Sequence, residues 1–250
     1  MRLILAGILF ITNICYASET MKVSIAVASN ALKAMQVIKK EFEKNTSYQL
    51  VISSGSTGKL YAQIINGAPY DVFLAANVRE PLRLESDNAI VKGSRFTYAR
   101  GRLALCSTKI DLDELTSKQR LTTGGFQRLA LASPKTAPYG IASKEVLEKM
   151  GAWKTNRIKY IQGENISQAY QFTASGNVDA GFVALAQVWG KTKTGLKKCW
   201  NVPEEYHSLL EQQAVWLKRS SNNIAASAFI RFLKSKKAKE ILRADFGYGV

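Results

Sequence analysis

The stretch KVSIAVASNALKAMQVIKKEFEKNTSYQLVISSGSTGKLYAQIINGAPYDVFLA, residues 22–75, decides the fold. Its apolar runs Val23–Val27, Gln49–Ile52 and Asp71–Ala75 have the length and composition of buried strands. The stretches between these runs carry apolar residues at helical spacing, as over Ser29–Phe42. This order of strands and helices predicts a parallel sheet covered by helices.

The same alternation resumes after Arg102 and continues to the C-terminus. The expected strands are Leu103–Cys106, Leu129–Leu131, Ile158–Ile161, Ala180–Val183 and Ala214–Leu217, and the expected helices are Pro138–Met150, Ile166–Thr173, Asn223–Leu233 and Ala238–Ala244. The whole chain is therefore expected to form α/β structure. Two units of this kind fit the pattern, and a single open sheet is the alternative.

The two units are expected to be lobes joined by two crossovers, which we place near Leu103–Ser107 and Glu211–Leu217. The first lobe is then discontinuous and comprises residues 18–103 and 216–250, whereas residues 104–215 form the second lobe.

Residues 1–17 have the composition of a secretory signal peptide. Met1-Arg2 provides a positive start, Leu3–Ile14 is almost wholly apolar, and Ala17 is a small residue of the kind that a signal peptidase recognises. The apolar run is too short to cross a bilayer as a permanent helix. A buried first helix is the alternative, and we expect cleavage after Ala17 and a periplasmic location.

The formal charge of the chain is +16, from 35 basic and 19 acidic residues. Such an excess is compatible with nucleic acid, an anionic membrane or an acidic ligand. The basic residues are scattered, and short clusters such as Lys236-Lys237 are typical of solvated faces. Because no nucleic-acid-binding motif is present, we expect no nucleic-acid partner.

Two cysteines, Cys106 and Cys199, remain after the signal segment. An exported chain with two cysteines is compatible with one disulfide, and the sequence leaves open whether these two are bonded. The single histidine, His207, and the absence of a cysteine–histidine cluster argue against a metal centre.

Four turns between a strand and a helix carry small or hydroxyl residues. They are Val27–Asn30, Ser53–Gly58, Pro134–Gly140 and Gly163–Ile166. A helix start presents unpaired N–H groups and a partial positive charge, so such turns bind anions at the carboxyl edge of a parallel sheet. Two turns fall in each lobe, which predicts an anion site between the lobes.

A hydrolase is the main enzymatic alternative, with Ser29, Asp71 and His207 as residue types of a catalytic triad. No Gly-x-Ser-x-Gly elbow is present, and His207 follows a stretch that reads as a loop. We expect a protein that is not an enzyme.

The chain resembles the periplasmic molybdate-binding proteins of bacterial ABC importers over nearly its whole mature length. The motifs that carry the resemblance are Ala26–Ala31 (AVASNA), Ser54–Leu60 (SGSTGKL), Gly67–Phe73 (GAPYDVF), Pro138–Gly140 (PYG), Gly151–Trp153 (GAW), Gly163–Asn165 (GEN) and Gly181–Val183 (GFV). Together these motifs are specific, although each fragment alone is weak.

The resemblance implies a two-lobed type II periplasmic-binding fold, with mixed, mainly parallel sheets and the oxyanion in the cleft. It places hydroxyl donors at Ser29 and Thr57, with Ser56 beside them, and backbone amide donors at Ser29, Thr57, Tyr139 and Ile166. One position departs from the family, because many members have a tyrosine where this chain has Ala184. The Tyr139 hydroxyl is the candidate replacement.

The resemblance also implies molybdate or tungstate as ligand, with molybdenum held only as the oxyanion and no cofactor. The expected partner is the membrane permease of an ABC importer, and we expect a monomer. Sulfate and phosphate are the alternative ligands, since their carriers share related folds. Iron is disfavoured, because these turns lack the clustered tyrosines or carboxylates that it needs.

Overall fold

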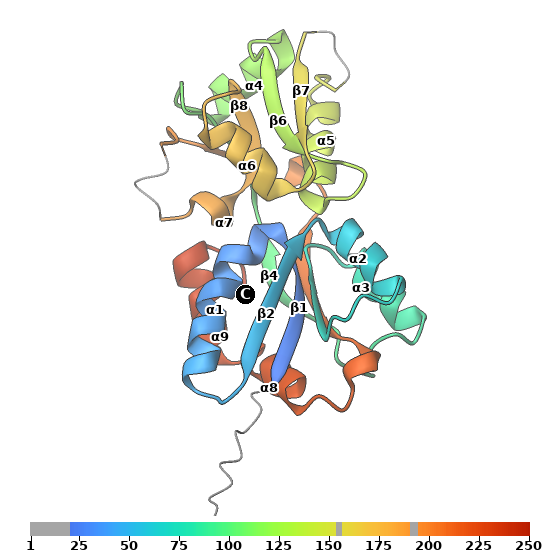
Figure 1. Ribbon diagram of the computed structural model, residues 1–250. Helices are drawn as coiled ribbons and strands as arrows, with labels where there is room; N and C mark the ends of the chain where they lie inside the picture. Colours follow the sequence, from blue (N-terminus) through green and yellow to red (C-terminus); the bar gives the residue numbers. More distant parts are fainter. Residues whose placement is uncertain (1–20, 154–156, 191–194) are drawn as a thin grey trace, which may run out of the picture.

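The computed structural model describes residues 21–153, 157–190 and 195–250, and they form two lobes that are stacked one above the other in Figure 1. Each lobe is built on a five-stranded sheet. The expected signal segment, residues 1–17, lies outside the described residues. In the described part of the chain, the model contains no helix that is both long enough and apolar enough to span a membrane.

The first lobe has the strand order β2-β1-β3-β10-β4. Its strands are β1 (Lys22–Ala28), β2 (Gln49–Gly55), β3 (Val72–Ala75), β4 (Phe96–Gly101) and β10 (Leu210–Trp216). Its helices and short turns are η1 (Ser29–Ala31), α1 (Leu32–Lys44), α2 (Thr57–Ile65), α3 (Arg79–Ser86), η3 (Lys218–Ser220), α8 (Ile224–Leu233), α9 (Lys236–Glu240) and η4 (Ile241–Asp245). Figure 1 shows α1 and α9 on one side of the sheet and α2 and α3 on the other.

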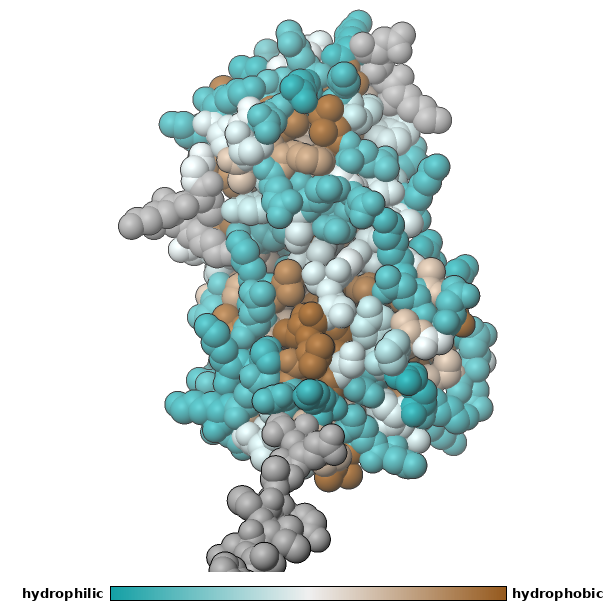
Figure 2. All heavy atoms as spheres, in the orientation of Figure 1, coloured by the Kyte–Doolittle hydropathy of each residue, from teal (hydrophilic) through white to brown (hydrophobic). Residues whose placement is uncertain are grey.

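Burial of apolar side chains explains why these helices cover the sheet. The apolar stripe of α1 is buried and includes Met35, Ile38 and Phe42, as its helical spacing predicts. The Phe42 ring meets Phe229 of α8 edge-on at 5.5 Å between ring centroids. On the face shown in Figure 2, apolar side chains gather over β2, the edge strand, where Val51 is exposed.

The second lobe has the strand order β7-β6-β8-β5-β9. Its strands are β5 (Leu103–Cys106), β6 (Arg128–Ala132), β7 (Lys159–Gly163), β8 (Ala180–Ala184) and β9 (Trp200–Asn201). Its helices are α4 (Glu114–Thr123), α5 (Pro138–Lys149), α6 (Ile166–Ala174), α7 (Leu185–Val188) and η2 (Glu204–Tyr206). A disulfide joins Cys106 of β5 to Cys199, with the Cα atoms 4.4 Å apart.

The two sheets are mixed and mainly parallel, as predicted, because four of the five strands in each sheet run in the same direction. In each sheet the first three strands of the order pair in parallel, and the other two pairings are antiparallel. One strand in each sheet runs against the other four, namely β10 in the first lobe and β5 in the second.

The crossovers lie slightly earlier than expected. The chain changes sheet at Arg102, between β4 and β5, and again between β9 and β10. The expected lobe limits therefore cut into β5 and β10, which each belong to one sheet. The start of β10 was missed because Gln212 and Gln213 are polar, yet both are buried inside the first lobe.

Candidate functional site

The four strand-to-helix turns converge on one pocket between the lobes. Ser29, Ser56 and Thr57 reach it from the first lobe, and Tyr139 and Ile166 reach it from the second. The complete lining is Ala28, Ser29, Asn30, Gly55, Ser56, Thr57, Ala76, Ala137, Pro138, Tyr139 and Ile166. All five residues expected to bind a ligand therefore lie together.

Three helices start at this pocket, and their N-terminal N–H groups lack intrahelical acceptors. Helix α2 begins at Thr57, and its N-cap residue Ser56 makes no side-chain cap hydrogen bond. Helix α5 begins with Pro138, and its N-cap residue likewise leaves the helix start uncapped. In α6, the Asn165 side chain accepts from the N–H groups of residues 167 and 168, so the Ile166 N–H is not capped by it.

Two hydroxyls in the pocket are positioned to donate. The Ser56 Oγ atom is buried and has no hydrogen-bond partner within the described residues, a costly arrangement unless a ligand pairs with it. The Thr57 Oγ1 atom accepts from the Ala76 N–H at 3.0 Å. That bond leaves the Thr57 hydroxyl hydrogen available to an acceptor in the pocket.

The Tyr139 side chain points elsewhere. Its hydroxyl lies 3.5 Å from Gln212 Nε2. It also lies so close to Gly101 that a Cβ atom at that position would be 2.1 Å away. Tyr139 lines the pocket, but we do not count its hydroxyl as the replacement for the donor absent at Ala184.

Sequence reasoning missed a buried polar network beneath the pocket. Asn30 lines the pocket, and its Nδ2 atom donates to Gln212 Oε1 at 2.8 Å and to the Tyr248 hydroxyl at 3.0 Å. The Tyr98 hydroxyl donates to the same Gln212 oxygen at 2.9 Å. The partners of Asn30 are 182 and 218 residues away in the chain, so no local pattern indicates them.

The tyrosines of this network stay protonated. Burial raises the pKa of Tyr98, Tyr139 and Tyr248 above the ordinary tyrosine range. The charge that Tyr248 would carry on ionisation raises the pKa of Tyr98 and Tyr139 further. Their hydroxyls are therefore protonated at neutral pH and can donate hydrogen bonds.

No residue in the pocket lining carries a formal charge. At the edge, Lys59 of the first lobe pairs with Glu164 of the second at 3.1 Å, but both side chains are about half or more exposed and the pair contributes little. Asp71 and His207 do not line the pocket, so Ser29 has no triad. The described residues contain no group of three His, Cys, Asp or Glu side chains that could hold a metal.

The lobes touch closely around the pocket. The Gly58 N–H donates to the Thr136 carbonyl at 2.9 Å, and Ser167 Oγ donates to the Ser29 carbonyl at 3.0 Å. The pocket has about 10 Å³ of free interior, close to the room that one water-sized sphere needs.

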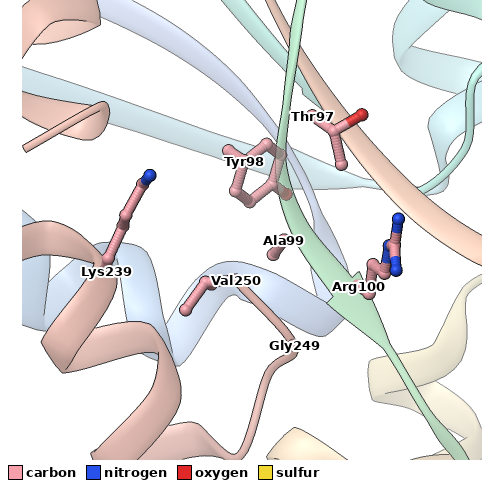
Figure 3. Close-up of a pocket in the computed structure, with 7 residues that line it drawn as sticks. All are labelled: Thr97, Tyr98, Ala99, Arg100, Lys239, Gly249 and Val250. Carbon is pink, nitrogen blue, oxygen red and sulfur yellow. The ribbon is translucent and has the colours of Figure 1, made fainter.

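A larger cavity of about 460 Å³ lies on the first lobe, between β4, Lys239 of α9 and the C-terminal Gly249 and Val250 (Figure 3). Its lining comes from one lobe only, and its cationic side chains, Arg100 and Lys239, are exposed. The pocket between the lobes is the better candidate, because donors from both lobes converge there.

The model of a family described as bacterial extracellular solute-binding protein matches residues 23–249. The chain belongs to this family. This solute-binding protein is 42% identical over 237 residues to the molybdate-binding protein ModA of Azotobacter vinelandii. The aligned residues cover 94% of this chain and 92% of that relative. It is 38% identical to ModA of Rhodobacter capsulatus, over 91% of this chain and 88% of that relative.

The solved structure of the Azotobacter vinelandii periplasmic molybdate-binding protein matches this solute-binding protein with a TM-score of 0.83. That match has 36% sequence identity and covers 91% of this chain and 99% of that chain. The two-lobed periplasmic-binding fold is thereby confirmed, and so is the expectation of a binding protein that is not an enzyme.

Proposed function

We propose that this solute-binding protein captures molybdate between its lobes and delivers it to the membrane permease of an ABC importer. One observation carries the proposal: a pocket without formal charge in which three helix starts from both lobes and buried hydroxyls of the first lobe converge. Aligned dipoles and hydrogen-bond donors hold a dianion without a countercharge. The molybdate-binding relatives, up to 42% identical, support this choice of ligand.

Tungstate belongs to the same proposal, because it has nearly the size and charge of molybdate. Sulfate is smaller, and donors fixed at helix starts fit it less well. Phosphate carries a proton at neutral pH and needs an acceptor, whereas the backbone groups in this pocket are donors. We also propose a periplasmic monomer with a cleaved signal peptide and no cofactor.

Calorimetric titration of the purified protein with molybdate, tungstate, sulfate and phosphate tests the proposal. We expect tight binding of the first two and much weaker binding of the others. Sulfate binding as tightly as molybdate would defeat the assignment.

Substitution of the first-lobe hydroxyls locates the site. Ser29→Ala and Thr57→Ala should each weaken molybdate binding by roughly 1–3 kcal/mol, because an oxyanion acceptor loses its donor. Ser54→Ala is the matched control, since Ser54 is exposed on β2 and does not line the pocket. Unchanged affinity in both pocket variants would show that the ligand binds elsewhere.

A further inference from the structure

Trp189, which directly follows α7 in the second lobe, packs on the C-terminal segment of the first lobe. Its indole N–H donates to the Ala244 carbonyl at 3.1 Å. A Cβ atom at Gly247 would lie 2.4 Å from Trp189 Cδ2, so the ring rests directly against the glycine backbone. Gly247 also has a φ of +63°, a conformation that favours glycine. The contact between the lobes therefore depends on glycine at this position.

Arg102 completes this contact from the crossover between β4 and β5. Its Nη2 atom donates to the Gly247 carbonyl at 2.6 Å. Its guanidinium lies 5.3 Å from the centre of the Trp189 ring, within the range of a cation–π interaction. The Arg102 carbonyl accepts from the Leu185 N–H at 2.9 Å, which ties the crossover to the start of α7.

The C-terminal segment, residues 244–249, links Trp189 to the oxyanion pocket, and we call it the strap. Within it, Tyr248 is 3% exposed, and its hydroxyl donates to the Asn30 carbonyl at 3.1 Å and accepts from Asn30 Nδ2 at 3.0 Å. Asn30 itself lines the pocket. The strap ends along β4, where Gly249 and Arg100 exchange two backbone hydrogen bonds of 2.6 and 3.0 Å (Figure 3).

We propose that the strap and Trp189 form a latch that stabilises the closed lobes and connects closure to the pocket through Tyr248 and Asn30. The contacts of Trp189 with the strap join one lobe to the other, and the latch requires that they break when the lobes part. An interaction made in only one of two states shifts the population toward that state. The proposal rests on the proposed function, because the oxyanion is the ligand that would favour closure.

Trp189→Phe tests the latch, because it keeps an aromatic ring and removes the indole N–H. Trp216→Phe is the matched control, since the Trp216 indole N–H donates to the Ser220 carbonyl at 3.1 Å within the first lobe. In stopped-flow chase experiments, molybdate should dissociate from Trp189→Phe about three- to tenfold faster than from wild type, the effect of one lost hydrogen bond. Trp216→Phe should dissociate at the wild-type rate.

Gly247→Ala is the stronger variant, because the new methyl group must displace the Trp189 ring. We expect faster molybdate dissociation than in Trp189→Phe and a larger radius of gyration of the unliganded protein by small-angle X-ray scattering. The urea midpoint of unliganded Trp189→Phe should stay at the wild-type value, since the latch joins the lobes without holding either one folded.

The outcomes separate the two proposals. If wild-type protein binds none of the oxyanions, the proposed function fails, and scattering still tests the latch. Gly247→Ala with the wild-type radius of gyration would then overturn the latch. If wild type binds molybdate but Trp189→Phe and Gly247→Ala both release it at the wild-type rate, the latch is wrong and the function stands.

Discussion

The two lobes bring different chemistry to the same pocket. In the proposed site, the first lobe offers the side-chain hydroxyls of Ser29, Ser56 and Thr57 beside the start of α2, whereas the second offers only backbone N–H groups, at Tyr139 and Ile166. A hydroxyl rotates and both donates and accepts, but a backbone N–H at a helix start only donates in a fixed direction. Side-chain substitution therefore tests the first lobe directly, and the second lobe needs a change in its backbone.

The largest expected effect is the loss of stability that follows removal of the disulfide. This bond lies within the second lobe, and the first lobe has no counterpart among the described residues. Replacing both Cys106 and Cys199 by serine should lower the free energy of unfolding by about 2–4 kcal/mol, since the bond spans 93 residues. Neither cysteine lines the pocket, so molybdate affinity should be nearly unchanged while the protein is folded. Urea unfolding and calorimetry check both values, and an unchanged urea midpoint would contradict the prediction.

Ile166→Pro removes the Ile166 backbone N–H, a proposed donor of the second lobe, and should leave helix α6 intact. Proline suits the first position of a helix, and the preceding Asn165 is extended, with φ −149° and ψ 173°. Loss of a hydrogen bond to a charged ligand should weaken molybdate binding by about 1.5–3 kcal/mol in calorimetry.

Ile166→Ala is the control for this change, because it loses the buried side chain and keeps the N–H. The proline variant should bind more weakly than the alanine variant. Equal affinity of the two would mean that the Ile166 amide does not contact the ligand.

Ser56→Ala and Thr57→Ala each remove a hydroxyl from the pocket, but they should differ in their effect on the stability of the unliganded protein. The Ser56 hydroxyl has no partner in the described part of the protein, so its removal should leave the unliganded protein equally or more stable. Thr57→Ala leaves the Ala76 N–H unpaired and should lower the stability by about 1 kcal/mol. Thermal unfolding without ligand measures the difference, and a stability loss in Ser56→Ala would indicate a structural role for that hydroxyl.

The smallest expected effect is a loss of stability at alkaline pH. The folded-state pKa of Tyr98, Tyr139 and Tyr248 is raised by burial, so their stabilising contribution is complete below the unfolded pKa of about 10 and is lost as the pH rises above it. Urea midpoints of wild type should therefore fall more steeply above pH 10 than those of Tyr248→Phe. Identical slopes would show that Tyr248 ionises in the folded state as it does in the unfolded chain.

The site was easier to predict from the sequence than the exact borders of the lobes. Apolar runs mark β1, β2 and β3, and hydroxyl or glycine residues after a strand mark the turns that meet in the pocket. All five predicted residues line it, because parallel strands place those turns on one edge.

Two features of the structure were not predicted from the sequence. Helix α4 was missed because only Ser117 and Leu121 are buried in it, although its capping residue Asp113 and the terminal Gly124 were visible signals. The network around Gln212 was missed because its polar residues are buried through contacts between distant segments. Apolar periodicity reports neither feature.

A crystal structure of the protein grown with molybdate tests the central claim most directly. Anomalous scattering from molybdenum should place the oxyanion between Ser29, Thr57, Tyr139 and Ile166, with oxygens at hydrogen-bond distance from groups of both lobes. An oxyanion bound elsewhere, or held through contacts to a single lobe, would contradict the claim.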